Sequence, residues 1–205
     1  MNIAILYQLF LKSTGVSTDT RKIDPGNIFF ALKGPNFNAN EFASKALEMG
    51  ASAVVVDEAA YFEEDDERYF ICENALVCLQ KLANYHRHQF DIPVIGLTGS
   101  NGKTTSKELL NAVLRTKFKT LATVGNLNNH IGVPLTLLAL NQSHELAIVE
   151  MGANKQGDIQ ELCEIAEPTH GFITNIGKAH LEGMGGPEGV LKTKTELYQH
   201  LRENK

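Results

Sequence analysis

The sequence is informative first for what it lacks. It has no hydrophobic run long enough to cross a membrane. Its formal net charge of −5 gives no basic footprint of the kind that nucleic-acid-binding proteins carry. Only three of the 205 residues are cysteines, an odd number without metal-ligand spacing. We therefore expect free thiols in a reducing cytoplasm, and neither a membrane-spanning nor a nucleic-acid-binding protein.

The apolar start of the chain does not have the features of a targeting signal. No basic segment precedes residues 3–11, and no small-residue cleavage site follows them. Apolar side chains instead recur there at helical spacing, which predicts an amphipathic surface helix. The overall composition, 43% hydrophobic and 21% charged, is that of an ordinary soluble globular protein.

A chain of this length holds one large domain or two modest ones. Asp91-Ile92-Pro93 is typical of a boundary, so we expect domains at residues 1–90 and 91–205. In the first, Asn40 is expected to cap a helix that ends at Gly50. The other elements expected there are strands at 28–32, 53–56 and 69–72 and a helix from 75 toward 90.

The second domain has a regular alternation of strand and helix patterns. We expect strands at 94–98, 119–124, 146–151 and 170–176, and helices at 104–115, 133–140, 158–166 and 187–201. Such alternation predicts an α/β fold with a mostly parallel sheet and helices on both faces. Ligands of these sheets bind at the carboxyl ends of the strands.

A glycine-rich turn joins the first strand of this domain to its first helix. It comprises Thr98, Gly99, Ser100, Asn101, Gly102, Lys103, Thr104 and Thr105. Its glycines let backbone N–H groups approach phosphate oxygens, and the helix N-terminus adds partial positive charge. Lys103 can reach the terminal phosphates of ATP, and the Thr104 hydroxyl can ligate Mg²⁺. The turn departs from the general Walker pattern, which has glycine where Leu97 stands, and a plain Gly/Ser-rich turn is the alternative.

Two further residues follow strands at the same edge of the predicted sheet. Glu150 ends an apolar run, and a carboxylate at that position is a natural Mg²⁺ ligand, with a helix cap or a solvated acid as the alternative. His180 comes shortly after the strand at 170–176, where it could contact metal or substrate, although a lone histidine is usually structural.

Lys194 falls in the apolar arc of the last helix, whereas Lys192 points to the opposite side. A lysine so placed either extends its ammonium to water or is neutralised, because an unpaired buried ammonium is costly. A buried lysine of lowered pKa can also react, for example with CO₂ to give a carbamate.

Residues 125–134 form an asparagine-rich loop between a strand and a helix. Neighbouring neutral amides suit the recognition of a polar ligand, although asparagine is also an ordinary turn residue. Asn126 and Asn129 are our candidates for positioning substrate.

An ordered series of motifs carries a resemblance to a known family. It runs through residues 17–22, 29–34, 98–104, 125–134, 150–154, 180–183 and 192–196. Together these resemble the Mur ligases, the ATP-dependent amide-forming enzymes of peptidoglycan precursor synthesis. The resemblance is greatest to the branch that adds D-alanyl-D-alanine to UDP-N-acetylmuramoyl-tripeptide.

The resemblance implies a mechanism. ATP phosphorylates the terminal carboxylate of the substrate, and an incoming amine attacks the acyl phosphate. Lys103 would neutralise phosphate charge, and Thr104 and Glu150 would hold one Mg²⁺. His180 and a carbamylated Lys194 would serve a second Mg²⁺.

The resemblance also implies a different role for each domain. It implies that the small N-terminal α/β domain recognises the UDP-sugar, with Ser17, Thr18 and Arg21 as candidates. Arg21 could face a diphosphate, or it could simply form a surface ion pair. Residues 91–205 would be an incomplete P-loop ATPase domain, and we expect a monomer.

Family members continue past the lysine motif, whereas this sequence stops at Lys205. We therefore expect an amino-terminal portion that lacks the adenine contacts and the D-alanyl-D-alanine site and does not turn over alone. Two alternatives stay open. One is a non-catalytic UDP-muramyl-peptide-binding module, and the other is a sister ligase, such as the one adding the third stem residue.

Overall fold

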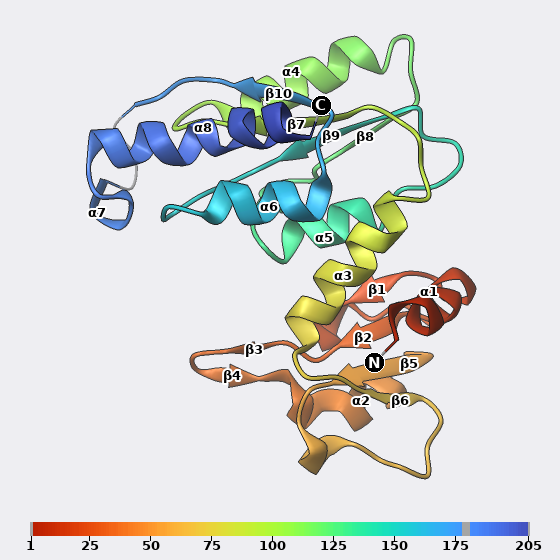
Figure 1. The fold of residues 1–205 in the computed structure, drawn as a ribbon. Helices are drawn as coiled ribbons and strands as arrows, with labels where there is room; N and C mark the ends of the chain where they lie inside the picture. The colour runs from red at the N-terminus through yellow and green to blue at the C-terminus, as the bar shows by residue number, and fades with distance from the viewer. Residues whose placement is uncertain (1, 178–180, 205) are drawn as a thin grey trace. The chain divides into compact units, whose positions relative to one another are not determined.

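The computed structural model describes residues 2–177 and 181–204 (Figure 1). The chain forms two compact units, Met1–Tyr85 and His86–Lys205, and the division falls inside one helix, α3 (Ala75–Arg87). Among the described residues, no helix combines the length and the apolar character needed to span a membrane.

The first unit is built on a parallel four-stranded sheet in the order β1-β2-β5-β6. These strands are Val16–Ser17, Ile28–Phe30, Ala53–Val56 and Tyr69–Ile71. Every residue of β2 and β5 is buried, as their unbroken apolar sequences require of strands covered on both faces. The unit also contains α1 (Ile3–Lys12), α2 (Ala43–Glu48) and a short hairpin of β3 (Lys33–Gly34) and β4 (Phe37–Asn38).

The expected cap at Asn40 is wrong. The chain enters a 3₁₀ turn at Ala39–Phe42 before α2 begins, and the side chain of Asn38 caps that turn. Asn40 is buried instead, and its amide exchanges two hydrogen bonds with Asp57, of 2.8 and 3.0 Å. A buried amide needs such partners, and Asp57 supplies both an acceptor and a backbone donor.

The second unit contains the sheet β10-β7-β9-β8, in which all neighbours are parallel. Its strands are β7 (Val94–Thr98), β8 (Thr120–Ala122), β9 (Leu146–Glu150) and β10 (His170–Ile173). Its helices are α4 (Lys103–Leu114), α5 (Gly132–Leu137), α6 (Asp158–Ala166), α7 (Leu181–Met184) and α8 (Pro187–Glu203). Figure 1 shows α4 on one side of this sheet and α5 and α6 on the other. The predicted α/β fold with a parallel sheet covered on both faces is confirmed.

Two glycines let α8 approach the sheet closely. A Cβ at Gly96 of β7 would lie 3.0 Å from Leu197 of α8, and one at Gly171 of β10 would meet the same side chain at 3.0 Å. Side chains at these positions would push the helix away. The close approach fixes the part of α8 that carries Lys194.

Candidate functional site

The glycine-rich turn follows β7 and packs closely against its neighbours. Thr98 is buried, and its hydroxyl donates to the carbonyl of Met151 over 2.8 Å. Gly99 has φ +148°, and a Cβ there would collide with Thr174. Gly102 adopts the left-handed conformation (φ +73°) directly before α4, and no described side chain caps that helix. The first N–H groups of α4 are therefore available to an anion.

The turn is also tied to the segment after β10. Ser100 N and Asn101 N donate to the backbone and side-chain oxygens of Asn175, at 3.0 and 3.1 Å. Thr174 Oγ1 in turn donates to Asn101 O, and Gly177 N donates to Ser100 Oγ. The backbone N–H groups of Ser100 and Asn101 therefore already have partners. The donors that remain open are those of the first turn of α4.

Lys103 and Thr104 stand at the start of α4, and Thr105 beside them is exposed. Lys103 folds its ammonium back onto the turn, 2.9 Å from the carbonyl of Gly99. The hydroxyl of Thr104 lies 3.3 Å from Glu150 Oε1 at the end of β9. The turn and the carboxylate therefore meet at one edge of the sheet, as the parallel arrangement requires.

Glu150 is almost completely buried, with 1% of its surface exposed. Its Oε1 accepts from Thr104 and, at 2.8 Å, from Asn128 Nδ2. Its Oε2 is buried with no partner among the described residues. A buried carboxylate oxygen without a partner is costly unless a cation compensates it. The carboxylate and hydroxyl oxygens here are the ligands a hard divalent cation such as Mg²⁺ prefers, so the residues present fit that ion.

Lys194 of α8 is 1% exposed, so of the two alternatives its ammonium does not extend to water, whereas Lys192 is exposed. Burial, and next the positive charge of Lys103, lower the pKa of Lys194 to about 8. Glu196, one half-turn further on, accepts from Gly157 N and Gln160 N, at 2.8 and 3.0 Å. It thereby caps α6 from a neighbouring helix and fixes the rotation of α8.

The asparagine loop contributes a residue that the sequence did not single out. Asn128 contacts Glu150, while Asn129 Oδ1 accepts from Ile131 N and Gly132 N at the start of α5. Asn126 is exposed. Asn128 and Asn129 also line a cavity of about 190 Å³ together with Lys103, His130, Gly152, Ala153, Asn154, Asp158, Glu161 and Leu162.

The candidates in the first unit are differently placed. Ser17 is buried in β1, and its hydroxyl donates to Asp19 O over 2.9 Å. The next residue, Thr18, is half-buried. Arg21 forms an exposed, two-bond ion pair with Asp19, at 2.7 and 2.9 Å, and this contact lowers the pKa of Asp19 to about 2. His180 lies outside the described residues.

Two family models account for most of the chain. Residues 97–205 match the Mur ligase middle domain, and residues 12–95 match the model described as Mur ligase family, catalytic domain. The chain belongs to the Mur ligase family.

Named Mur ligases are similar over nearly the whole sequence. UDP-N-acetylmuramoyl-tripeptide–D-alanyl-D-alanine ligase of Bacillus subtilis is 40% identical over 93% of the chain and 42% of its own length. A crystal structure of MurF from Acinetobacter baumannii superposes with a TM-score of 0.86 at 36% identity, over 98% of this chain and 46% of that one. The structure of MurF from Thermotoga maritima in complex with ADP superposes with a TM-score of 0.84 at 36% identity, over 95% of this chain and 45% of that one. The chain thus spans less than half the length of these Mur ligases.

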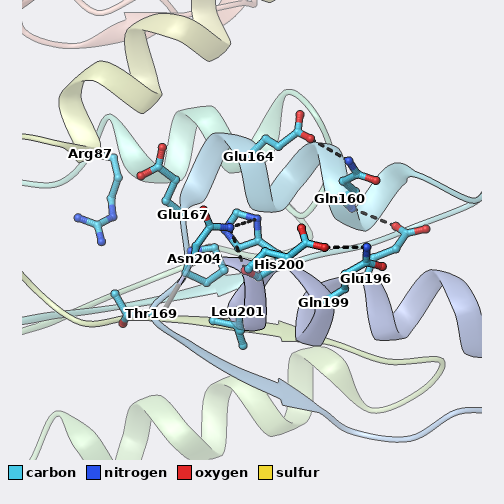
Figure 2. Close-up of a pocket in the computed structure, with 12 residues that line it drawn as sticks. Arg87, Gln160, Glu164, Glu167, Thr169, Glu196, Gln199, His200, Leu201 and Asn204 are labelled. Atoms are coloured by element: carbon cyan, nitrogen blue, oxygen red, sulfur yellow. Dashed lines mark hydrogen bonds between the residues drawn. The ribbon is translucent and has the colours of Figure 1, made fainter.

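A second, larger cavity of this Mur ligase chain lies at the opposite edge of the sheet. About 550 Å³ in volume, it is bounded by Arg87, by the residues just before β10, by α6 and by the carboxyl-terminal half of α8. Within it, Gln160 donates to Glu164 Oε1 and Asn204 donates to the backbone carbonyl of His200 (Figure 2). None of the candidate residues of the glycine-rich turn lines this cavity, and neither Glu150 nor Lys194 does.

Proposed function

We propose that this chain carries the ATP-binding and UDP-sugar-binding parts of a ligase that adds D-alanyl-D-alanine to UDP-N-acetylmuramoyl-tripeptide through an acyl phosphate. The observation that carries the proposal is the buried Glu150 carboxylate, whose Oε2 has no described partner, beside Thr104 at the open N-terminus of α4. The names of the similar Mur ligases and the ADP of the T. maritima structure support the choice of substrates and nucleotide.

The phosphates of ATP would lie at the turn from Thr98 to Thr105. The N–H groups of the first turn of α4 would donate to phosphate oxygens. Lys103 would leave the carbonyl of Gly99 and pair with the terminal phosphates, where negative charge develops during transfer. Thr104 and Glu150 would hold Mg²⁺, which when bound neutralises phosphate charge and orients the transferred group.

Lys194 is proposed as a carbamate that, with His180, serves a second Mg²⁺. Its burial and its pKa of about 8 support this role, because a substantial fraction of the amine is neutral near that pH. The nitrogen lone pair would attack CO₂, an N–C bond would form, and the amine would release a proton. The product is anionic, so it would also remove the cost of a buried ammonium.

We propose that residues 1–90 recognise the UDP-sugar and residues 91–205 bind ATP. Ser17, Thr18 and Arg21 are the candidates for the UDP-sugar, and Arg21 would exchange Asp19 for a diphosphate. Asn126 and Asn129 are the candidates for positioning the tripeptide end. The 190 Å³ cavity beside Lys103 supports Asn129 in that role.

The proposal extends to the setting of the reaction. We propose a cytoplasmic monomer, since its nucleotide-linked precursors and ATP are cytoplasmic metabolites, and its three cysteines are free. Sedimentation velocity of the purified chain would test the monomer, because the molar mass derived for a dimer would be twice 22.5 kDa.

Calorimetric titration tests the nucleotide and substrate assignments separately. We expect the chain to bind ATP more tightly with Mg²⁺ than with EDTA, and Glu150→Gln to remove that gain. UDP-N-acetylmuramoyl-tripeptide should bind in a second, independent titration. Binding of the UDP-sugar without any response to Mg-ATP would reject the ligase assignment and favour a non-catalytic binding module.

Carbon-13 NMR tests the carbamate. In ¹³C-bicarbonate, a carbamate resonance should appear in the unaltered chain and in Lys192→Met, and be absent from Lys194→Met. The exposed Lys192 is the matched control because it lies on the same helix. A resonance that survives in Lys194→Met would reject Lys194 as its source.

A further inference from the structure

A second lysine of α4 lies behind the candidate metal site, fully buried. Lys107 follows Lys103 by four residues, so both side chains leave the same side of the helix. None of the surface of Lys107 is exposed. Its Nζ lies 2.6 Å from the carbonyl oxygen of Thr123 and 2.7 Å from Glu108 Oε1. Lysines are almost never fully buried without a specific partner, and Lys107 has these two.

The acceptor of Lys107 is itself joined to the metal-site carboxylate. Thr123 directly follows β8 and is 1% exposed. Its N–H donates to Ile148 O over 3.0 Å, and its hydroxyl accepts from the N–H of Glu150 over 2.9 Å. Thr123 therefore holds the backbone of β9 at the residue whose side chain faces Thr104.

The same threonine begins the loop that leads to Asn128. Lys107 thus links α4, through Thr123, to the backbone of β9 at Glu150 and to the start of the loop that carries Asn128. Glu108, whose carboxylate is largely exposed, balances the charge of the ammonium without entering the site.

We infer that Lys107 is a positioning residue for the divalent cation of Mg-ATP, acting through Thr123 on Glu150. Residues that orient metal ligands from behind usually contribute tenfold or more to metal affinity. For its ligand, the inference rests on the proposed function, because it takes the cation at Glu150 to be the one that accompanies ATP. Lys107 touches neither the nucleotide nor the cation in this role.

Hydrogen exchange of the ligand-free chain tests the link directly. In Lys107→Met, the amide of Glu150 and those of residues 123–124 should exchange about tenfold faster, because a charge-assisted hydrogen bond is lost. The control Lys119→Met removes an exposed lysine directly before β8 and should leave these amides unchanged. A merely structural role would instead accelerate exchange throughout the sheet. Unchanged exchange at Glu150 would overturn the inference.

Nucleotide titration supplies the second readout. Lys107→Met should bind ATP in EDTA as the unaltered chain does, but the gain in affinity on adding Mg²⁺ should fall about tenfold. Thr123→Val should show the same loss, and Thr123→Ser, which keeps the hydroxyl, should restore the gain. An undiminished Mg²⁺ gain in Lys107→Met would overturn the inference even if exchange changes.

Two provisions keep the outcomes distinct. Should Lys107→Met fail to fold, Lys107→Gln replaces it, since this side chain is polar but one bond too short to reach Thr123 O, and the same changes are expected. Should the unaltered chain bind no nucleotide, the ATP assignment fails, while exchange at Glu150 still decides the role of Lys107.

Discussion

Asn128 donates a 2.8 Å hydrogen bond from its Nδ2 to Oε1 of Glu150, a buried carboxylate whose other oxygen has no described partner. The contact joins the loop after β8 to the end of β9. It also distinguishes Asn128 from its neighbours, because Asn129 caps α5 and Asn126 is exposed. The three asparagines of one short loop therefore have three different surroundings.

Removing the Asn128 amide should destabilise the chain. Asn128→Ala leaves Glu150 Oε1 with only the longer contact to Thr104, and we expect the free energy of unfolding to fall by about 2 kcal/mol. The control Asn126→Ala should change it by less than about 0.5 kcal/mol. Urea unfolding of both variants at pH 7 measures the difference. Equal effects would show that the Asn128 contact contributes nothing specific.

Glu150→Gln should separate stability from cation binding. The neutral amide removes a buried charge, so the ligand-free variant should be as stable as the unaltered chain or up to about 2 kcal/mol more stable. Its thermal unfolding in EDTA measures this. Stabilisation by Mg-ATP should meanwhile disappear, because the carboxylate ligand is gone. A clear loss of stability in EDTA would mean that the carboxylate serves the fold rather than a cation.

The lowered pKa of Lys194 predicts how stability changes with pH. Between about pH 8 and the ordinary lysine value of 10.5, the unfolded chain holds a proton that the folded chain has lost. Stability from this residue is therefore smallest below pH 8 and increases up to pH 10.5. Lys194→Met should be more stable by about 2 kcal/mol at pH 7, and the difference should shrink toward pH 10.5. Urea unfolding at pH 7 and pH 10 in CO₂-free buffer tests this; a constant difference would contradict it.

Two glycines of the turn should respond differently to the same substitution. Gly99→Ala combines an unfavourable backbone conformation with a collision at Thr174, and should cost about 3 kcal/mol. Gly102→Ala has a positive φ but open space around its Cβ, and should cost only about 1 kcal/mol. Thermal unfolding compares them. If Gly99→Ala cost no more than Gly102→Ala, the collision with Thr174 would be shown to be unimportant.

The sequence predicted the elements that have strong periodicity and missed those that depend on a few residues. All the strands and helices expected in the second unit are present, with ends that differ by a few residues. The two-residue strand β1 and the hairpin of β3 and β4 were missed, because two residues carry no measurable alternation.

The same distinction applies to the site. The apolar arc singled out Lys194 but left open whether its ammonium reaches water, and the equally buried Lys107 stands in a helix whose pattern gave no signal. Asn128 could not be told from Asn126 and Asn129, since asparagine serves turns, caps and ligands alike. Which of these tasks each residue has depends on contacts with distant segments, here Thr123 and Glu150.

The hydrogen bonds between Ser100, Asn101 and residues 174–177 have a thermodynamic consequence. They make the glycine-rich turn and the segment after β10 a single mechanical unit, so an ordering contact to either segment favours the same arrangement of both. A ligand bound by one segment then raises the affinity of the other segment for its own ligand. Thermodynamic linkage requires the reverse effect to be equal in size. Ligands of the turn and of the segment after β10 would thus bind with positive heterotropic cooperativity.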